Sequence, residues 1–197
     1  MSGRWCLAGL LLLCAFGAQA DERVMVCFNY GCLAQAEVVY DDLQLRELGQ
    51  IFATAADASH ERAAIAIAIG RLLGWAGKQS PIFADRGGNY EDGGVNGMMD
   101  CIDHSTTTTR LLQMIDAQGL LHYHRVLEPA LRSRLLIFEH YSALIEEIDS
   151  AGQQAGAAPQ DGRRYVVDSW FFDNGQPAVV MPLARWQAGE SPDGAQQ

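Results

Sequence analysis

Three residues of the chain have the types and the order expected of a thiol enzyme. Cys101 follows a glycine-rich loop and opens a segment with helical character, and His140 and Asp168 follow it along the chain. The thiolate is the reactive form of cysteine, and a free cysteine is mostly protonated at neutral pH. A helix N-terminus, an imidazole and a carboxylate that orients the imidazole are the usual means of activating it. These three residues therefore suggest nucleophilic chemistry at Cys101.

The segments around His140 and Asp168 decide whether these side chains can meet Cys101. We expect a strand at 139–143, but the wider stretch 134–148 also fits an amphipathic helix, and in a helix His140 would have only a structural role. Asp168 lies in the strand-like segment 165–170, where burial and therefore a partner are expected. An ordinary turn or ladder carboxylate is the alternative at this position.

Cys101 needs a helix that begins at its own position. Asp100 and Asp103 place acidic groups at the start of the segment, apolar residues recur at helical spacing, and Gly119 stands where a helix would end. The β-branched run 106–109 disfavours a helix, but the acidic start, the apolar spacing and the glycine together favour one. The alternative for Cys101 is a small buried apolar residue without chemistry.

The cysteines of the N-terminal part indicate a hairpin. Strand-like segments at 24–28 and 36–40 flank the turn Asn29-Tyr30-Gly31, so Cys27 and Cys32 lie close to a chain reversal. A disulfide there is feasible, and two buried thiols are the alternative. If the bridge forms, Cys101 is the odd cysteine of the mature chain.

The segments between hairpin and Cys101 have helical patterns followed by a loop. Apolar residues recur at helical spacing from 43 to 52, and 60–75 is rich in Ala, Ile and Leu, as in a buried helix. The loop 84–97 then carries five glycines and leads to Cys101. Loops of this length in compact domains tend to be functional.

The first 20 residues have the pattern of a secretory signal peptide. Arg4 precedes the apolar run 7–16, and Ala18-Gln19-Ala20 resembles a cleavage site. Their removal deletes Arg4 and no acidic residue, so the formal charge changes from −10 to −11. An acidic chain of this kind has no electrostatic footprint for nucleic acid. We expect a periplasmic or secreted protein without an integral membrane span after cleavage, made of one domain at 21–188 and a loose polar tail at 189–197.

The motifs around the three residues resemble the transglutaminase-like, papain-related superfamily of cysteine hydrolases, as in an exported bacterial member. Cys101-x-Asp103-x-Ser105 resembles the family's cysteine helix, 139–143 its histidine strand and 165–170 its aspartate strand. The joint order of the motifs carries the resemblance, which covers about 100–170. The chain departs from the family in the acidic residue before Cys101 and in the longer spacing between His140 and Asp168. A Gly-, Ala- and Gln-rich insertion at 150–162 accounts for the longer spacing.

The resemblance implies a fold and a mechanism. The fold is α+β, with helices, including the cysteine-bearing one, packed on a C-terminal antiparallel sheet. Cys101 would attack an acyl carbon as a thiolate, His140 would take and return the proton, and Asp168 would hold the imidazole tautomer. The Cys101 amide would be one oxyanion donor. The expected reaction is hydrolysis of a peptide, amide or isopeptide bond in a peptide or protein substrate, with no cofactor.

Two other function classes remain open at this stage. His122 and His124 are spaced to share one face of a strand predicted at 120–126, a geometry that zinc or copper sites use. A binding module that kept the fold and lost turnover is the other class. The oligomeric state does not follow from the sequence.

Overall fold

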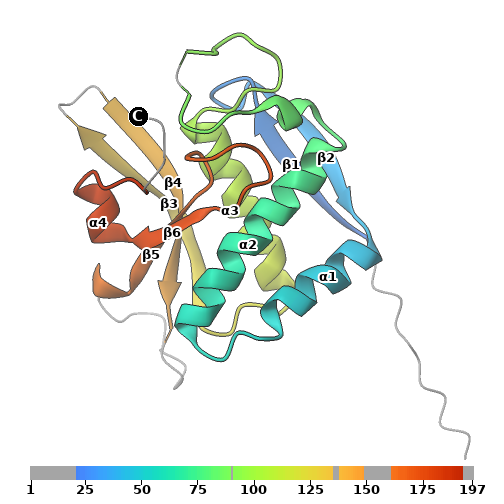
Figure 1. Cartoon of the computed structure of the whole chain (residues 1–197), viewed down its shortest axis with the longest axis vertical. Helices are drawn as coiled ribbons and strands as arrows, with labels where there is room; N and C mark the ends of the chain where they lie inside the picture. Colours follow the sequence, from blue (N-terminus) through green and yellow to red (C-terminus); the bar gives the residue numbers. More distant parts are fainter. Residues whose placement is uncertain (1–20, 90, 135–137, 149–160, 193–197) are drawn as a thin grey trace, which may run out of the picture.

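The chain forms two antiparallel sheets with helices packed against them (Figure 1). The computed structural model describes residues 21–89, 91–134, 138–148 and 161–192. The first sheet is the hairpin of β1 (Glu22–Phe28) and β2 (Ala34–Tyr40). The second has the order β3-β4-β5-β6, with strands β3 (His124–Arg134), β4 (Phe138–Glu147), β5 (Arg164–Asp168) and β6 (Val179–Pro182). The predicted α+β class and the N-terminal hairpin are confirmed.

Aspartates begin the three long helices. Asp41, Asp57 and Asp100 each accept a hydrogen bond from the backbone N–H three residues on, which satisfies a donor that lacks a partner within the helix. The helices are α1 (Asp42–Phe52), α2 (Ala58–Gly77), α3 (Cys101–Ala117) and the short α4 (Leu183–Gln187), with 3-10 turns η1 (Pro81–Ala84) and η2 (Asp161–Arg163). Among the described residues, none of the helices is both long and apolar enough to cross a bilayer.

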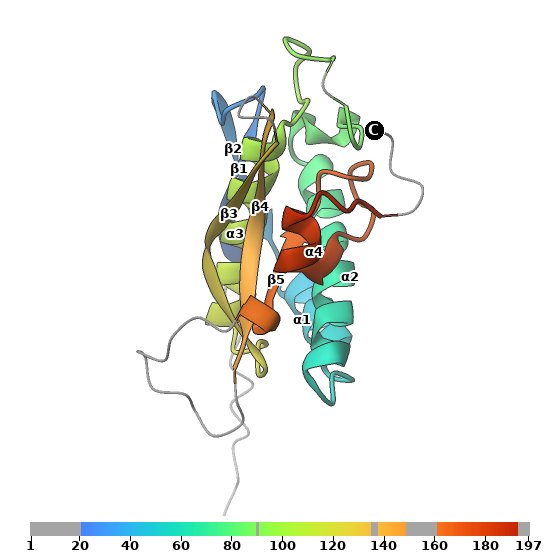
Figure 2. The ribbon, with the colours of Figure 1, turned by 90° about the vertical axis from the view of Figure 1, so that its left-hand side faces the viewer.

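Helix α3 packs between the two sheets, as Figure 2 shows, with β1 on one side and β3 and β4 on the other. Three of its four threonines are buried, although the run is unfavourable for a helix, and two of the hydroxyls bond to other segments. Thr107 accepts from the Cys27 amide at 2.9 Å, and the Thr108 hydroxyl lies 2.9 Å from that of Ser169. Tertiary contacts therefore outweigh the low helix propensity of these residues.

The two faces of the larger sheet pack against different helices. Ala143, Ile145 and Val167 belong to the main core, together with residues of α2 and α3. Leu144 and Val166, one residue out of step, belong to a second cluster with Trp186 of α4. Because side chains alternate along a strand, the even-numbered residues of β4 and β5 face α4.

The glycine-rich loop before α3 is fixed by close approaches to other segments. Gly97 has a φ of +93°, and a Cβ there would lie 2.3 Å from the Pro81 carbonyl oxygen. A Cβ on Gly87 would lie 2.4 Å from the Cα of Phe172. The predicted signal peptide lies outside the described residues, as do most of the insertion 150–162 and the end of the tail.

Candidate active site

Cys101 is the first residue of α3 and carries the unpaired thiol of the described part of the chain. The other cysteines described there, Cys27 and Cys32, form the predicted disulfide. The Cys101 side chain is partly exposed, and its Sγ lies 3.9 Å from the carbonyl oxygen of Glu139. This contact places the thiol beside β4 at the residue that precedes His140.

His140 lies in a strand, so the alternative of an amphipathic helix over 134–148 is wrong. β4 pairs with β3 and β5, and its hydrogen bonds fix the direction of each side chain. His140 is buried, and its Nε2 lies 2.7 Å from Oδ2 of Asp168. Within the described part of the chain, the other ring nitrogen, Nδ1, is buried without a hydrogen-bond partner.

Asp168 is the last residue of β5 and is buried with a full set of donors. Its Oδ2 accepts from His140 and also from the indole N–H of Trp186 at 2.9 Å, while Oδ1 accepts from the Trp170 amide at 3.2 Å. These three donors satisfy the hydrogen-bonding requirement of a buried carboxylate. The prediction that Asp168 is buried and partnered is confirmed, and Asp168 stands at the end of the β5 ladder, opposite Val179, and not in a turn.

Aromatic rings enclose the His140–Asp168 pair. The His140 ring lies 4.9 Å from the Trp170 ring, 5.6 Å from Trp186 and 5.8 Å from Phe171, measured between ring centres. These rings shield the pair from water and lower the local dielectric. The interaction between the ring and the carboxylate is therefore stronger than it would be in solvent.

The ring of His140 is held in its charged form. Burial lowers the pKa of His140, but the hydrogen bond to Asp168 and the interactions of the ring with the Cys101 thiol and with the charge of Asp168 outweigh burial and raise the pKa to about 9. An imidazolium that interacts with a cysteine favours the thiolate. The same ring, once neutral, can act as a proton acceptor.

A second buried network, which the sequence reasoning missed, lies behind the site. His104, one turn along α3 from Cys101, has Nδ1 2.8 Å from the Ser169 hydroxyl and Nε2 3.0 Å from Oδ2 of Asp85. Burial lowers the pKa of His104, but the charge of Asp85 outweighs burial and raises the pKa. Asp85 also accepts from the Met99 amide at 2.8 Å. The network links the glycine-rich loop, α3 and the residue that follows Asp168.

His124 belongs to a third histidine–carboxylate pair, with a structural setting. Its Nδ1 lies 2.8 Å from Oε1 of Glu61, which is fully buried in α2, and its Nε2 lies 3.3 Å from Arg62. Burial raises the pKa of Glu61, but the bonds from the His124 ring and from the amides of His122 and Tyr123 outweigh it and lower the pKa.

The predicted metal geometry of His122 and His124 is wrong. Glu61 accepts the N–H groups of His122 and Tyr123 at 2.6 and 3.0 Å, and β3 begins only at His124, not at residue 120. His122 is consequently exposed while His124 is buried, so the two rings do not share a strand face.

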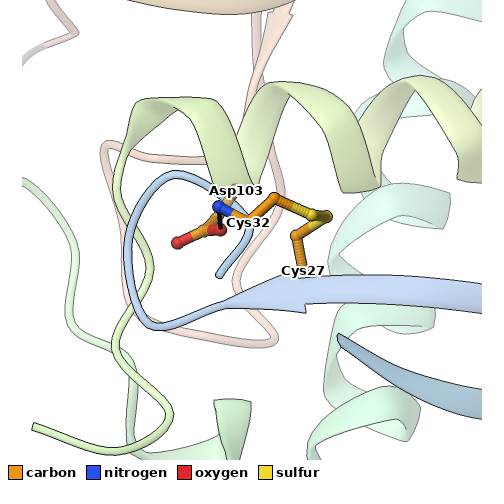
Figure 3. A group of neighbouring side chains, drawn as sticks. All are labelled: Cys27, Cys32 and Asp103. Carbon is orange, nitrogen blue, oxygen red and sulfur yellow. Dashed lines mark hydrogen bonds between the residues drawn. A yellow bond between two sulfur atoms is a disulfide. The ribbon is translucent and has the colours of Figure 1, made fainter. Parts of the chain in front are cut away.

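One cluster in the described residues has the ligand types of a metal site, formed by Cys27, Cys32 and Asp103 (Figure 3). Their possible ligand atoms lie within 4.8 Å of one another. Both sulfurs are joined in the disulfide, and a disulfide lacks the thiolates that bind metals. The donor set therefore does not fit a metal ion while the bridge is intact.

Comparisons with protein-family models, curated proteins and solved structures found no match to this chain.

Proposed function

We propose that the protein is a thiol hydrolase that transfers an acyl group to Cys101 and then to water. The observation that carries the proposal is the environment of His140, whose Nε2 is bonded to Asp168 and whose charged form is favoured by Cys101. The buried and otherwise unpartnered Nδ1 is the atom left to exchange a proton with the thiol.

The reaction has two halves that balance in protons. The Cys101 thiolate adds to the acyl carbon, and the imidazolium of His140 gives its proton to the departing amine, which leaves a thioester and a neutral ring. The ring then takes a proton from water, the hydroxide attacks the thioester, and the thiolate and the imidazolium are restored. Asp168 keeps the Nε2–H in place through both halves.

The oxyanion formed in each half needs donors at the helix start. Cys101 is the first residue of α3, where a backbone N–H has no partner within the helix. We assign that amide as one oxyanion donor, with a second from the preceding loop. The substrate class is a peptide, amide or isopeptide, and the family proposed is the transglutaminase-like one. The disulfide fits export to the periplasm or the medium, because such bridges persist in oxidising compartments.

The test joins thiol labelling with acyl-enzyme trapping. Labelling of the purified protein with iodoacetamide across pH should modify Cys101 with a half-maximal rate well below the free-cysteine value of about 8.5. A panel of peptide amides and activated esters should give an acylated protein by intact mass, and Cys101→Ser should abolish the thioester adduct. Normal folding with labelling that follows pH 8.5 would refute the enzyme and favour a binding module. Turnover that survives Cys101→Ser would refute the assigned nucleophile.

A further inference from the structure

The turn between β1 and β2 has an unusual backbone. Asn29, Tyr30, Gly31 and Cys32 are four consecutive residues in the left-handed region, with φ values of 68°, 63°, 62° and 58°. Glycine adopts this region freely, but residues with a Cβ do so at an energetic cost. Such a run persists only where surrounding contacts hold it.

The turn directs three successive amides at two carboxylates. Tyr30 and Cys32 donate to the two oxygens of Asp103, at 2.8 and 2.6 Å, and Gly31 donates to Asp100 at 2.8 Å. Successive N–H groups of this kind form an anion-binding concavity, or nest. The ligand of this nest belongs to the protein itself, because both carboxylates come from the first turn of α3.

The two carboxylates flank Cys101. Asp100 is the N-cap and Asp103 the third residue of α3, and each side chain accepts the other's amide, at 2.9 and 3.2 Å. Burial and the charge of Asp100 raise the pKa of Asp103 to about 6. The first turn of α3, with Cys101 in it, is therefore tied to the turn 29–32.

The same turn also holds the loop that precedes Cys101. The Asn29 side chain accepts from the Gly97 amide at 2.8 Å, the Asn29 amide donates to the Met98 carbonyl at 2.8 Å, and the Tyr30 hydroxyl donates to Asp92. Both segments that meet at Cys101 are thus anchored on these four residues.

The disulfide closes this turn. Cys27 and Cys32 are five positions apart, so the bridge closes a very short loop, and a short loop gives less stabilisation of the whole chain than a long one. Its main effect is local, since it fixes the Cys32 amide opposite Asp103 (Figure 3).

We infer that the Cys27–Cys32 disulfide and its nest are a positioning device for Cys101, which holds Asp100 and Asp103 so that the thiol stays beside His140. Asp103, Asp100 and the turn 29–32 are positioning residues and do not touch the reacting atoms. The effect on catalysis rests on the proposed function, while the clamp on α3 does not.

The experiment compares the wild-type protein with Cys27→Ser/Cys32→Ser by two readouts. Hydrogen exchange of the amides at 29–32 and at 103 and 104, which donate to Asp100, reports the clamp, and the pH profile of iodoacetamide labelling reports the position of Cys101. We expect at least tenfold faster exchange in both segments, labelling at pH 7 slowed about tenfold, and a half-maximal rate shifted toward pH 8.5. Unchanged exchange of the amides at 103 and 104 in the folded double variant would overturn the inference.

Two further variants keep the test valid if the double variant does not fold. Asp103→Asn replaces one acceptor of the nest by a donor, and Gly31→Ala adds a Cβ with no atom within 4 Å but at a φ of +62°. Asp57→Asn is the control for a weakened helix cap, because Asp57 is the N-cap of α2 and accepts the amide three residues on, as Asp100 does in α3. Exchange of the amides at 103 and 104 should rise for the first two variants and stay unchanged for the control, and equal exchange in all three would refute the clamp. If wild-type labelling follows pH 8.5, the proposed function fails, yet the exchange readout still decides the inference.

Discussion

His140 and His124 are both buried histidines bonded to a buried carboxylate, but their second ring nitrogens differ. His124 has Glu61 at one nitrogen and Arg62 at the other, at 2.8 and 3.3 Å. His140 has Asp168 at one nitrogen, and the other is buried without a partner on the side left for Cys101. A pair whose nitrogens are both engaged holds elements together, while a pair with an open nitrogen beside a thiol can move a proton.

The two pairs also differ in what surrounds the histidine. Arg62, which lies at the second ring nitrogen of His124, pairs with Glu147 at 2.8 Å and stacks on Tyr165, with its guanidinium carbon 4.0 Å from the ring centre. Asp168 has no arginine among its hydrogen-bond partners in the described chain, only His140, an indole and an amide. The charge that compensates Asp168 is therefore the imidazolium itself, which is why the two regions should respond differently to substitution and to pH.

The largest expected difference concerns activity. His140→Asn should lower kcat/KM by about 10⁴-fold, or about 5 kcal/mol, because it removes the group that moves the proton. His124→Asn should leave kcat/KM of the folded protein within about threefold, since His124 lies in the Glu61 cluster. Steady-state rates on the substrate found by acyl trapping, normalised to folded protein by circular dichroism, check this. Equal losses in both variants would contradict the distinction between the pairs.

Stability should show the reverse order. Glu61→Gln should lower the free energy of unfolding by about 3–5 kcal/mol, because it leaves the buried His124 without its carboxylate partner and turns an amide donor toward the His122 and Tyr123 amides. Urea unfolding measures the loss. Glu147→Gln is the matched control: Glu147 pairs with Arg62 at 2.8 Å but is partly exposed, so the cost should stay below about 1 kcal/mol. Equal costs would show that burial of Glu61 is not decisive.

The pH dependence of the unfolding free energy tests whether the His140 ring is charged in the folded state. Its pKa of about 9 in the folded state lies above the ordinary 6.5, so the folded state holds this proton more tightly. The resulting stabilisation, roughly 3 kcal/mol, is complete below pH 6.5 and is lost as the pH rises to 9. Unfolding free energies of wild type and His140→Asn should therefore converge between these values. A constant difference from pH 6 to 9 would refute the charged ring.

Sequence reasoning found the residues of the proposed site because each has a local pattern. Alternation around 139–143 favours a strand, and Asp100 and Asp103 favour a helix start. It left the strand at His140 undecided, because 134–148 is apolar at positions that suit both periods. Pairing with β3 and β5, which are distant in sequence, decides for the strand.

The errors and omissions come from partners far apart in the chain. His122 fails as a strand residue because Glu61, 61 positions earlier, binds its amide. The Asp85–His104–Ser169 network joins residues with no shared motif, so no local pattern indicates it. The left-handed turn at 29–32 likewise has one glycine, and its conformation depends on carboxylates of α3.

The smallest effect we expect comes from Trp186, which shares Oδ2 of Asp168 with His140. Trp186→Phe keeps an aromatic ring in the buried cluster but removes the indole N–H, at a cost of about 1–2 kcal/mol in unfolding free energy. Trp75→Phe, the same substitution in the main core, controls for lost volume.

A purely structural Trp186 would lower stability and change nothing else. If the Trp186 indole N–H also stabilises the negative charge of Asp168, its removal has a second effect, because Oδ2 of Asp168 then interacts with His140 alone. The pKa of His140, followed by NMR of the ring protons, should consequently rise in Trp186→Phe and stay unchanged in Trp75→Phe. If it does not rise, Asp168 holds the imidazolium independently of its second donor, and the indole serves only to pack against the pair.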